Sequence, residues 1–234
     1  MPHSTLTDLF DKYGRTARLF PALLCLPPYL LIDQDVLSKY FPATITSGIF
    51  VTLGDVSLSV VLLYLLVQVN RMVSKLLFED RRAFPTTQAL MPGGAGLSDQ
   101  YRSRIALKVN ADFRLSLPDT HAVALDREAA EQRCAEIGSQ IVNRVAKGRL
   151  LYQHNIEYGF VRNLLGGCVL SFAVSCVAAC AFRWVVPDHA RLIFSLALAT
   201  AYFIPLLFSR WILGYFSRAY AHILFREYVG DGLV

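Results

Sequence analysis

Two stretches of the chain run for about the length of a membrane span without a charged residue. The first covers residues 163–182 and the second covers residues 192–209. A helix needs roughly 20 mostly apolar residues to cross about 30 Å of hydrocarbon. The whole chain is also 54% hydrophobic and only 18% charged, whereas about 25% of the residues of an ordinary soluble domain are charged. The sequence therefore predicts an all-α membrane protein.

Two less regular apolar stretches bring the number of predicted transmembrane helices to four. Residues 49–69 are long enough to span but include Asp55. Residues 19–32 form a shorter stretch, which also suits a re-entrant or interfacial segment. Basic residues before it and acidic residues after it favour a short span that starts in the cytoplasm. Three prolines should kink or unwind this stretch, so that neighbouring helices must bond the freed carbonyls; they are Pro21, Pro27 and Pro28.

Lysine and arginine are concentrated on one side of the predicted membrane. They follow the second apolar stretch, precede the third and follow the fourth, at residues 71–82, 144–162 and 210–226. Because cytoplasmic flanks are rich in these residues, both termini and the central segment are predicted to be cytoplasmic. The net charge of +5 is then mainly a topology signal, with attraction to the lipid bilayer as a second effect. The basic residues are dispersed and no recognition motif accompanies them, so no nucleic-acid partner is expected.

The predicted domains follow from these spans. Residues 1–70 form an N-terminal membrane hairpin with spans at 19–32 and 49–69, and residues 163–209 form a C-terminal hairpin with spans at 163–182 and 192–209. Residues 71–162 hold most of the charge and are predicted to form a cytoplasmic helical domain between the second and third spans. Residues 210–234 are predicted to form an interfacial amphipathic tail, because aromatic residues and arginines alternate along it.

Two helices can be placed inside the central domain. Ser98 is a suitable N-cap for a helix that continues to about Lys108. Between residues 126 and 147, five apolar residues recur at spacings of three and four, so they share one face of an amphipathic helix that needs a packing partner. These residues are Ala130, Cys134, Ile137, Ile141 and Val145.

An acidic residue inside the second span is a candidate for an ion path or gate. Asp55 has Thr52 and Ser59 at neighbouring helix positions. A central aspartate costs about 2.5–3.5 kcal/mol on insertion, so it should face protein or water. The alternative is that Asp55 lies near the outer headgroups or bonds the kinked backbone of the first helix.

The third span carries a face of small side chains at every fourth residue: Gly167, Ser171, Ser175 and Ala179. Such a face lets two helix backbones approach closely. The partner helix could belong to the same chain or to another copy. The need to pack four spans together favours the same chain.

A polar cluster precedes the third span and consists of His154, Asn155, Glu157, Arg162 and Asn163. It could form a ligand-binding or gating ring, or simply anchor the helix at the interface. Its spacing matches no metal motif, and no carboxylate pair is placed for acid–base chemistry. The five cysteines show no ligand spacing and are expected at helix contacts. No catalytic residue, metal, cofactor or enzymatic activity is therefore predicted.

Three stretches carry a resemblance to a known group of proteins: residues 154–167 (HNIEYGFVRNLLGG), 18–24 (RLFPALL) and 84–87 (FPTT). They resemble uncharacterised bacterial multi-spanning membrane proteins, which implies a place in the bacterial inner membrane. The general build is also similar to that of small membrane effectors of anti-phage defence systems. That similarity implies oligomers that disrupt the inner membrane once a partner or nucleotide signal arrives.

Two functions are therefore expected to compete. The first is an oligomeric, channel-like membrane effector that is controlled through its cytoplasmic domain, with antiviral defence as its candidate role. The second is a membrane anchor or regulatory scaffold that binds a soluble protein partner through residues 71–162.

Overall fold

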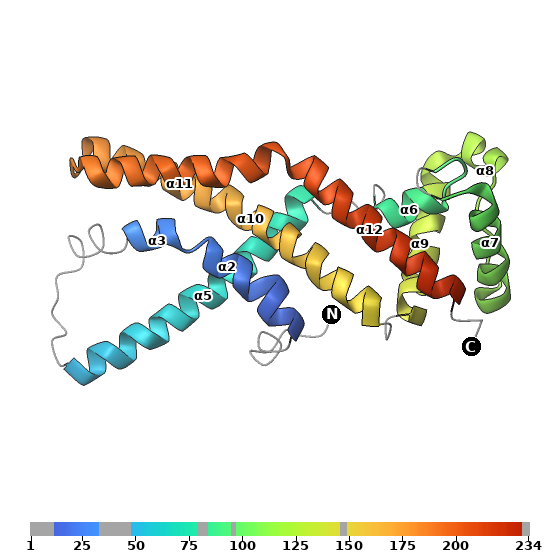
Figure 1. Ribbon diagram of the computed structural model, residues 1–234, viewed down its shortest axis with the longest axis horizontal. Coiled ribbons are helices and arrows are strands. Elements are labelled where there is room, and N and C mark those ends of the chain that lie inside the picture. Colours follow the sequence, from blue (N-terminus) through green and yellow to red (C-terminus); the bar gives the residue numbers. More distant parts are fainter. Residues whose placement is uncertain (1–11, 33–47, 79–83, 95–96, 146–148, 231–234) are drawn as a thin grey trace. The chain divides into compact units, whose positions relative to one another are not determined.

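The computed structural model describes residues 12–32, 48–78, 84–94, 97–145 and 149–230. Side chains are described for these residues except 48–59, 62, 149 and 150. Every regular element within these ranges is a helix (Figure 1), so the predicted all-helical class is confirmed there. The chain divides into two compact units, which are Met1–Phe78 with Gly159–Arg210 and Glu79–Tyr158 with Trp211–Val234.

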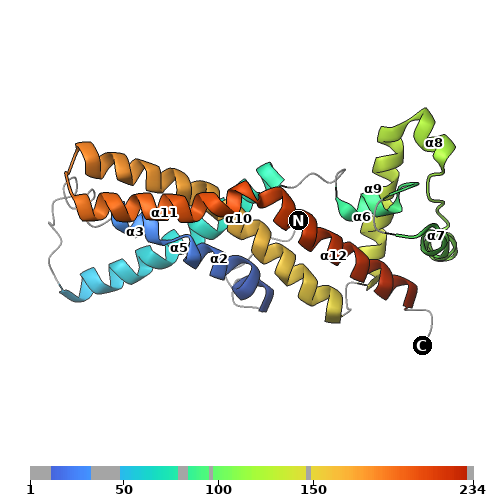
Figure 2. The same cartoon turned by 45° about the horizontal axis from the view of Figure 1, so that its top comes forward.

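The first unit is built around long apolar helices. Helix α10 (Arg149–Trp184) passes from the second unit into the first, and α11 (His189–Leu207) follows it. Within the described residues, the segments 151–184 and 189–207 are long and apolar enough to cross a membrane. In both views α11 lies beside the last part of α10 (Figures 1 and 2). The two charge-free stretches of the sequence therefore belong to helices of spanning length.

The other two predicted spans have a different outcome. Residues 19–32 do not form one helix but a π-helix η1 (Gly14–Leu19), a short α2 (Phe20–Leu24) and a short α3 (Pro27–Ile32). The interruption lies at the prolines, as predicted. Residues 49–69 fall within α5 (Gly48–Phe78). Most side chains of that stretch lie outside the described residues, so four spans remain a prediction.

The first unit exposes large apolar side chains and buries several small polar ones beside apolar residues such as Val67 and Leu165. On α11, Ile193 is 67% exposed and Leu207 is 62% exposed, whereas Ser195 is fully buried. On α10, Ser171 and Ser175 are fully buried. Large apolar residues normally fill the interior of a soluble protein. An apolar outer surface over a small polar interior is the arrangement suited to lipid.

The second unit has an ordinary apolar core. It contains α6 (Pro85–Leu90), α7 (Asp99–Phe113), α8 (Thr120–Leu125), α9 (Arg127–Val145), the start of α10 and most of α12 (Ser209–Gly230). Helix α9 packs against both α6 and α8. Its predicted apolar face is confirmed, because all five of its residues are buried in the core.

Short-range signals explain where the helices of this unit begin. The Ser98 hydroxyl accepts a hydrogen bond from the Tyr101 backbone N–H at 3.2 Å, which confirms the predicted N-cap. The sequence prediction ended this helix near Lys108, but it continues to Phe113. Helix α8 was not predicted. Asp119 caps it by accepting from the Ala122 N–H at 2.7 Å. The residues Leu117–Pro118 are typical of a turn and favoured that interpretation of the sequence instead.

Helix α12 belongs to the core of the second unit. Its buried residues are Ala221, Leu224, Phe225 and Tyr228, together with Ser217. Tyr101 donates to the Phe225 carbonyl at 3.1 Å, and Lys108 donates to the Tyr228 carbonyl at 2.6 Å. The compact units divide the chain differently from the predicted domains, because the interfacial tail predicted at 210–234 shares a core with the central segment. Burial of its apolar face joins the tail to the central domain, while residues 71–78 and 159–162 belong to the first unit.

Candidate functional site: a capped break in the first helical segment

The prolines of the N-terminal segment leave particular carbonyl groups without their helical donors. In an α-helix the N–H of each residue bonds the carbonyl four residues earlier, and proline has no N–H. In a regular α-helix Pro21 would leave the carbonyl of Ala17 without a donor, and Pro28 would do the same for Leu24; in this chain Ala17 lies in the π-helix η1. In apolar surroundings an unbonded carbonyl costs several kcal/mol, so each needs another donor.

Asn163 of α10 supplies the donor for the first carbonyl. Its side-chain Nδ2 donates to the Ala17 carbonyl at 2.6 Å. The Ser74 hydroxyl of α5 lies 3.2 Å from Asn163 Oδ1 and 2.8 Å from the Arg71 carbonyl. Asn163 and Ser74 are both buried. One amide therefore links the N-terminal segment, α5 and α10.

Two hydroxyl groups bond the carbonyls at the break between α2 and α3. The Tyr202 hydroxyl of α11 donates to the Leu24 carbonyl at 2.9 Å. The Ser171 hydroxyl of α10 donates to the Cys25 carbonyl at 2.8 Å. The Tyr29 N–H, which would bond the Cys25 carbonyl in a continuous helix, instead bonds the Leu26 carbonyl at 3.0 Å. The break is thus held by side chains from two helices that lie far away in the sequence.

Glycines let α10 approach the N-terminal segment and α5 closely. A Cβ atom at Gly167 would lie 2.5 Å from Cys25 Sγ and 2.7 Å from Asn70 Nδ2. A Cβ atom at Gly166 would lie 2.5 Å from the Asn70 carbonyl oxygen. Both positions exclude a larger side chain unless the neighbouring helices move.

The predicted small-residue face is occupied within the chain at its N-terminal end. Gly167 and Ser171 contact Cys25. Further along the face, the Ser175 hydroxyl donates to the Ser171 carbonyl at 2.7 Å, and Ala179 is buried. These placements are contacts within one chain, and they put α10 against the N-terminal segment.

In the first unit, both amide atoms of Asn70 on α5 and the hydroxyl of Ser195 on α11 are buried without a hydrogen-bond partner among the described residues. In the second unit, the same holds for Glu227 Oε2. Asn70 is only 2% exposed. Such groups are unusual because an unsatisfied buried donor costs about 1–3 kcal/mol.

The other predicted candidates are placed differently. Thr52, Asp55 and Ser59 lie on α5, but their side chains are outside the described residues. The predicted polar cluster divides between the units: His154, Asn155 and Glu157 fall in the second unit, and Arg162 and Asn163 in the first. His154 Nδ1 and Glu157 Oε2 pair at 3.0 Å. Asn155 is exposed and Arg162 is half-buried, so the five residues differ in their surroundings.

The described residues offer no obvious metal centre. No group of three or more His, Cys, Asp or Glu side chains is placed there to hold an ion. Cys25, Cys134 and Cys168 are buried, and Cys180 is exposed. Burial raises the pKa of Cys134, in the second unit, to about 11. Its thiol therefore stays protonated and unreactive near neutral pH.

Sequence reasoning missed several members of this site. The prolines identify the freed carbonyls, but nothing local identifies Tyr202, Ser74 or Asn70 as their neighbours. No protein-family model, curated protein or solved structure matches the chain. The function is therefore argued from the geometry of the chain's own residues.

Proposed function

We propose that the chain is a multi-pass protein of the bacterial inner membrane that anchors a helical regulatory unit for a soluble partner. The observation that carries this proposal is the contrast between its two units. The first unit exposes many large apolar side chains on α11 and buries serine and asparagine beside two small apolar clusters, whereas the second unit has one larger apolar core. One continuous helix, α10, belongs to both units.

The capped break supports the anchor role. Hydrogen bonds from Asn163, Ser171 and Tyr202 tie the N-terminal segment to α10 and α11. Interhelical hydrogen bonds and close glycine contacts are the interactions that hold helices together in lipid, where no hydrophobic force drives them together. They favour a rigid membrane unit from which α10 and α12 lead into the regulatory unit.

A second candidate is an oligomeric, channel-like effector, as in membrane-disrupting defence proteins. The unpaired polar groups of Asn70 and Ser195 favour it. A rearrangement that admitted water to the interior of the first unit would satisfy both of them. In that state part of the small-residue face would be released to contact another copy.

Labelling of single cysteines tests the membrane topology. In a cysteine-free background, Asp188→Cys lies in the turn between α10 and α11, and Leu107→Cys lies on α7. An impermeant maleimide applied to cells with a permeable outer membrane should label position 188 and should reach position 107 only after lysis. Equal labelling of the two positions in intact cells would contradict the four-span arrangement.

Membrane potential and dye entry distinguish the two functions in cells that express the chain. The anchor predicts an unchanged potential, both alone and with the genes that accompany the chain. Depolarisation that is abolished by replacing Asn70 with leucine, but not by replacing the exposed Asn155 with leucine, would favour the effector.

A further inference from the structure

Helix α12 carries an exposed stripe of basic and aromatic residues beside its buried face. Successive members are three or four residues apart, so they lie on one side of the helix. All five are exposed, while the intervening residues Ala221, Leu224 and Phe225 fill the core. The stripe consists of Trp211, Tyr215, Arg218, His222 and Arg226.

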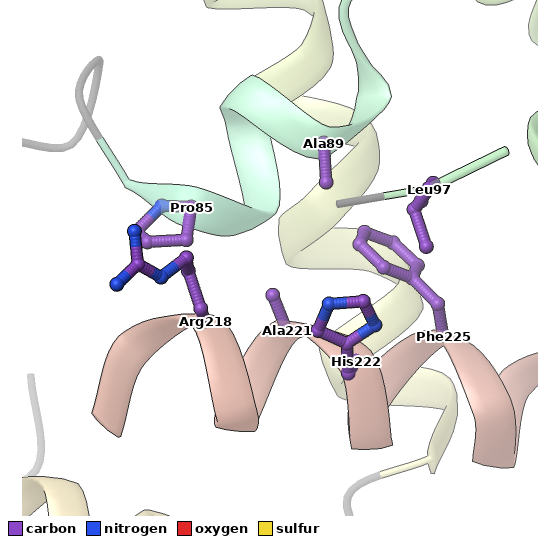
Figure 3. Close-up of a pocket in the computed structure, with 7 residues that line it drawn as sticks. All are labelled: Pro85, Ala89, Leu97, Arg218, Ala221, His222 and Phe225. Atoms are coloured by element: carbon purple, nitrogen blue, oxygen red, sulfur yellow. The ribbon is translucent and has the colours of Figure 1, made fainter. Parts of the chain in front are cut away.

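The basic part of the stripe borders two hollows on the surface of the second unit. A small hollow lies between α6 and α12 and includes Pro85, Arg218 and His222. Figure 3 shows Arg218 reaching toward Pro85, with His222 one turn further along the same helix. A larger open cleft, of about 560 Å³, includes Ser98, Tyr101, His222 and Arg226. His222 therefore borders both hollows.

The charge around these hollows has one sign. No Asp or Glu is among the residues that line either of them. Among the described residues, Arg218 and Arg226 have no carboxylate partner. Ser98 adds a hydroxyl group at the N-terminal end of α7, where the helix dipole favours an anion although Asp99 lies in the same turn. The Tyr101 hydroxyl already donates to the Phe225 carbonyl. The chemistry of this surface suits a phosphate group.

The aromatic part of the stripe points to the source of that phosphate. Trp211 and Tyr215 stack with ring centres 6.5 Å apart, and α12 begins at Ser209, immediately after the spanning-length α11 ends at Leu207. Tryptophan and tyrosine are enriched at the level of lipid headgroups. Arg218 follows Ser209 by roughly 14 Å along the helix axis at about 1.5 Å per residue. For Arg218, that length is comparable with a headgroup layer of about 5–8 Å plus a Debye length of about 8 Å. Arg226 follows Ser209 by roughly 26 Å, so it reaches the headgroups only if the helix axis is inclined to the membrane normal.

We infer that this stripe of α12 binds the phosphate headgroup of an anionic phospholipid in the membrane that α11 enters. Arg218 and His222 offer one binding position for a phosphate, His222 and Arg226 offer a second, and the Trp211–Tyr215 pair lies at the interface. The inference rests on the proposed membrane location and adds a specific lipid ligand to it. Binding would hold the regulatory unit against the bilayer, since α12 is also part of its core.

The test uses the full-length chain in a neutral maltoside detergent. Trp184→Phe leaves Trp211 as the only tryptophan, because the chain has two, and its fluorescence reports on the stripe. The probes are dihexanoyl phosphatidylglycerol, dihexanoyl phosphatidylcholine and inorganic phosphate, each below micelle-forming concentration. Phosphatidylglycerol should bind more tightly than the other two probes, and its binding should weaken with added salt. The Arg218→Gln/Arg226→Gln variant should bind it at least about tenfold more weakly.

The matched control is Arg133→Gln/Arg144→Gln, which removes the same charge from exposed positions on α9 and should leave binding unchanged. Equal binding by wild type and the α12 variant would overturn the site. Equal or tighter binding of inorganic phosphate would overturn the lipid as its ligand. If the α12 variant unfolds, His222→Gln alone should still weaken binding, and unchanged binding there would count against the site.

Carbonate extraction of membranes that contain the same chain tests the proposed location separately. Release of the chain by carbonate would overturn the membrane location alone if phosphatidylglycerol still bound wild type more tightly than the α12 variant. Retention of the chain in the membrane, together with equal phosphatidylglycerol binding by wild type and the α12 variant, would overturn the headgroup site alone.

Discussion

The side-chain amide of Asn163 donates to the Ala17 carbonyl at 2.6 Å, across 146 residues of sequence. Ala17 is the residue whose carbonyl would have no donor in a regular α-helix, because position 21 is proline. The same asparagine also meets Ser74 of α5. A polar residue that looks like an interfacial anchor in the sequence is therefore a structural cap inside the first unit.

Replacing Asn163 with alanine should destabilise the first unit by about 0.6–1.7 kcal/mol, which are the mean and the maximum measured for interhelical hydrogen bonds in one membrane protein. Asn155→Ala removes an exposed amide from the same helix and should have little effect. Thermal stability of the detergent-solubilised chain, measured by the fraction that remains monodisperse after heating, compares the two. Pro21→Ala should partly rescue Asn163→Ala, because alanine restores the missing N–H. An additive loss in the double variant would contradict this account of the cap.

Two glycines provide a matched pair of substitutions. Gly167→Ala places a Cβ atom 2.5 Å from Cys25 Sγ, and overpacking of this kind costs about 1–3 kcal/mol. Gly138→Ala on α9 meets nothing within 4 Å and should stabilise its helix by roughly 0.5–1 kcal/mol. The same heating assay measures both variants. Equal thermal stability of the two alanine variants would show that α10 does not lie this close to the N-terminal segment.

Two exposed leucines should respond differently to a positive charge if the first unit lies in lipid. Leu196 on α11 is 52% exposed and Leu107 on α7 is 74% exposed. Leu196→Arg should reduce membrane insertion because a central arginine costs about 2.5–3.5 kcal/mol. Leu107→Arg should be neutral because its surroundings are water. Carbonate-resistant protein, quantified for both variants, gives the comparison, and equal retention would argue against lipid around α11.

The buried thiol of Cys134 makes the second unit sensitive to alkali. Burial raises its pKa from 9.0 to about 11, so between these values the folded state binds more protons than the unfolded state. The stabilisation is complete below pH 9 and is lost as the pH rises through about 11. Between pH 8.5 and 10.5, wild type should therefore lose more thermal stability than Cys134→Ala.

Alkylation of the same thiol gives an independent measurement. At pH 8, iodoacetamide should modify Cys134 slowly in the folded chain and quickly in urea, because the thiolate is the reactive form. Peptide mass spectrometry assigns the modification to this cysteine. A folded chain that reacts at the unfolded rate would show that the α9 face is not buried.

Features that depend on neighbouring residues could be predicted from the sequence. The apolar face of α9 follows from a helical period, and its residues Cys134 and Ile141 are fully buried. Ser98 caps α7 because its hydroxyl reaches an N–H only three residues away. The interruption at Pro21, Pro27 and Pro28 follows from the missing proline N–H groups. Each of these features depends on interactions within a few residues.

The partners of these features could not be predicted, because they come from distant parts of the chain. Pro28 shows that the Leu24 carbonyl needs a donor, but Tyr202 supplies it from 178 residues away. The aromatic and basic composition of the tail indicated an interface, yet it did not show that Phe225 and Tyr228 would fill a core beside α7.

Sequence alone therefore placed the apolar helices, the proline break and the amphipathic face of α9, because local periodicity and backbone chemistry specify them. Tertiary packing selected which side chains cap the freed carbonyls and which face of α12 stays exposed. The physical reason is that any nearby hydroxyl or amide can bond a free carbonyl, and any apolar face can cover another. The close approach of α10 at Gly166 and Gly167 allows Asn163 and Ser171 to reach these carbonyls, and the packing of α11 supplies Tyr202.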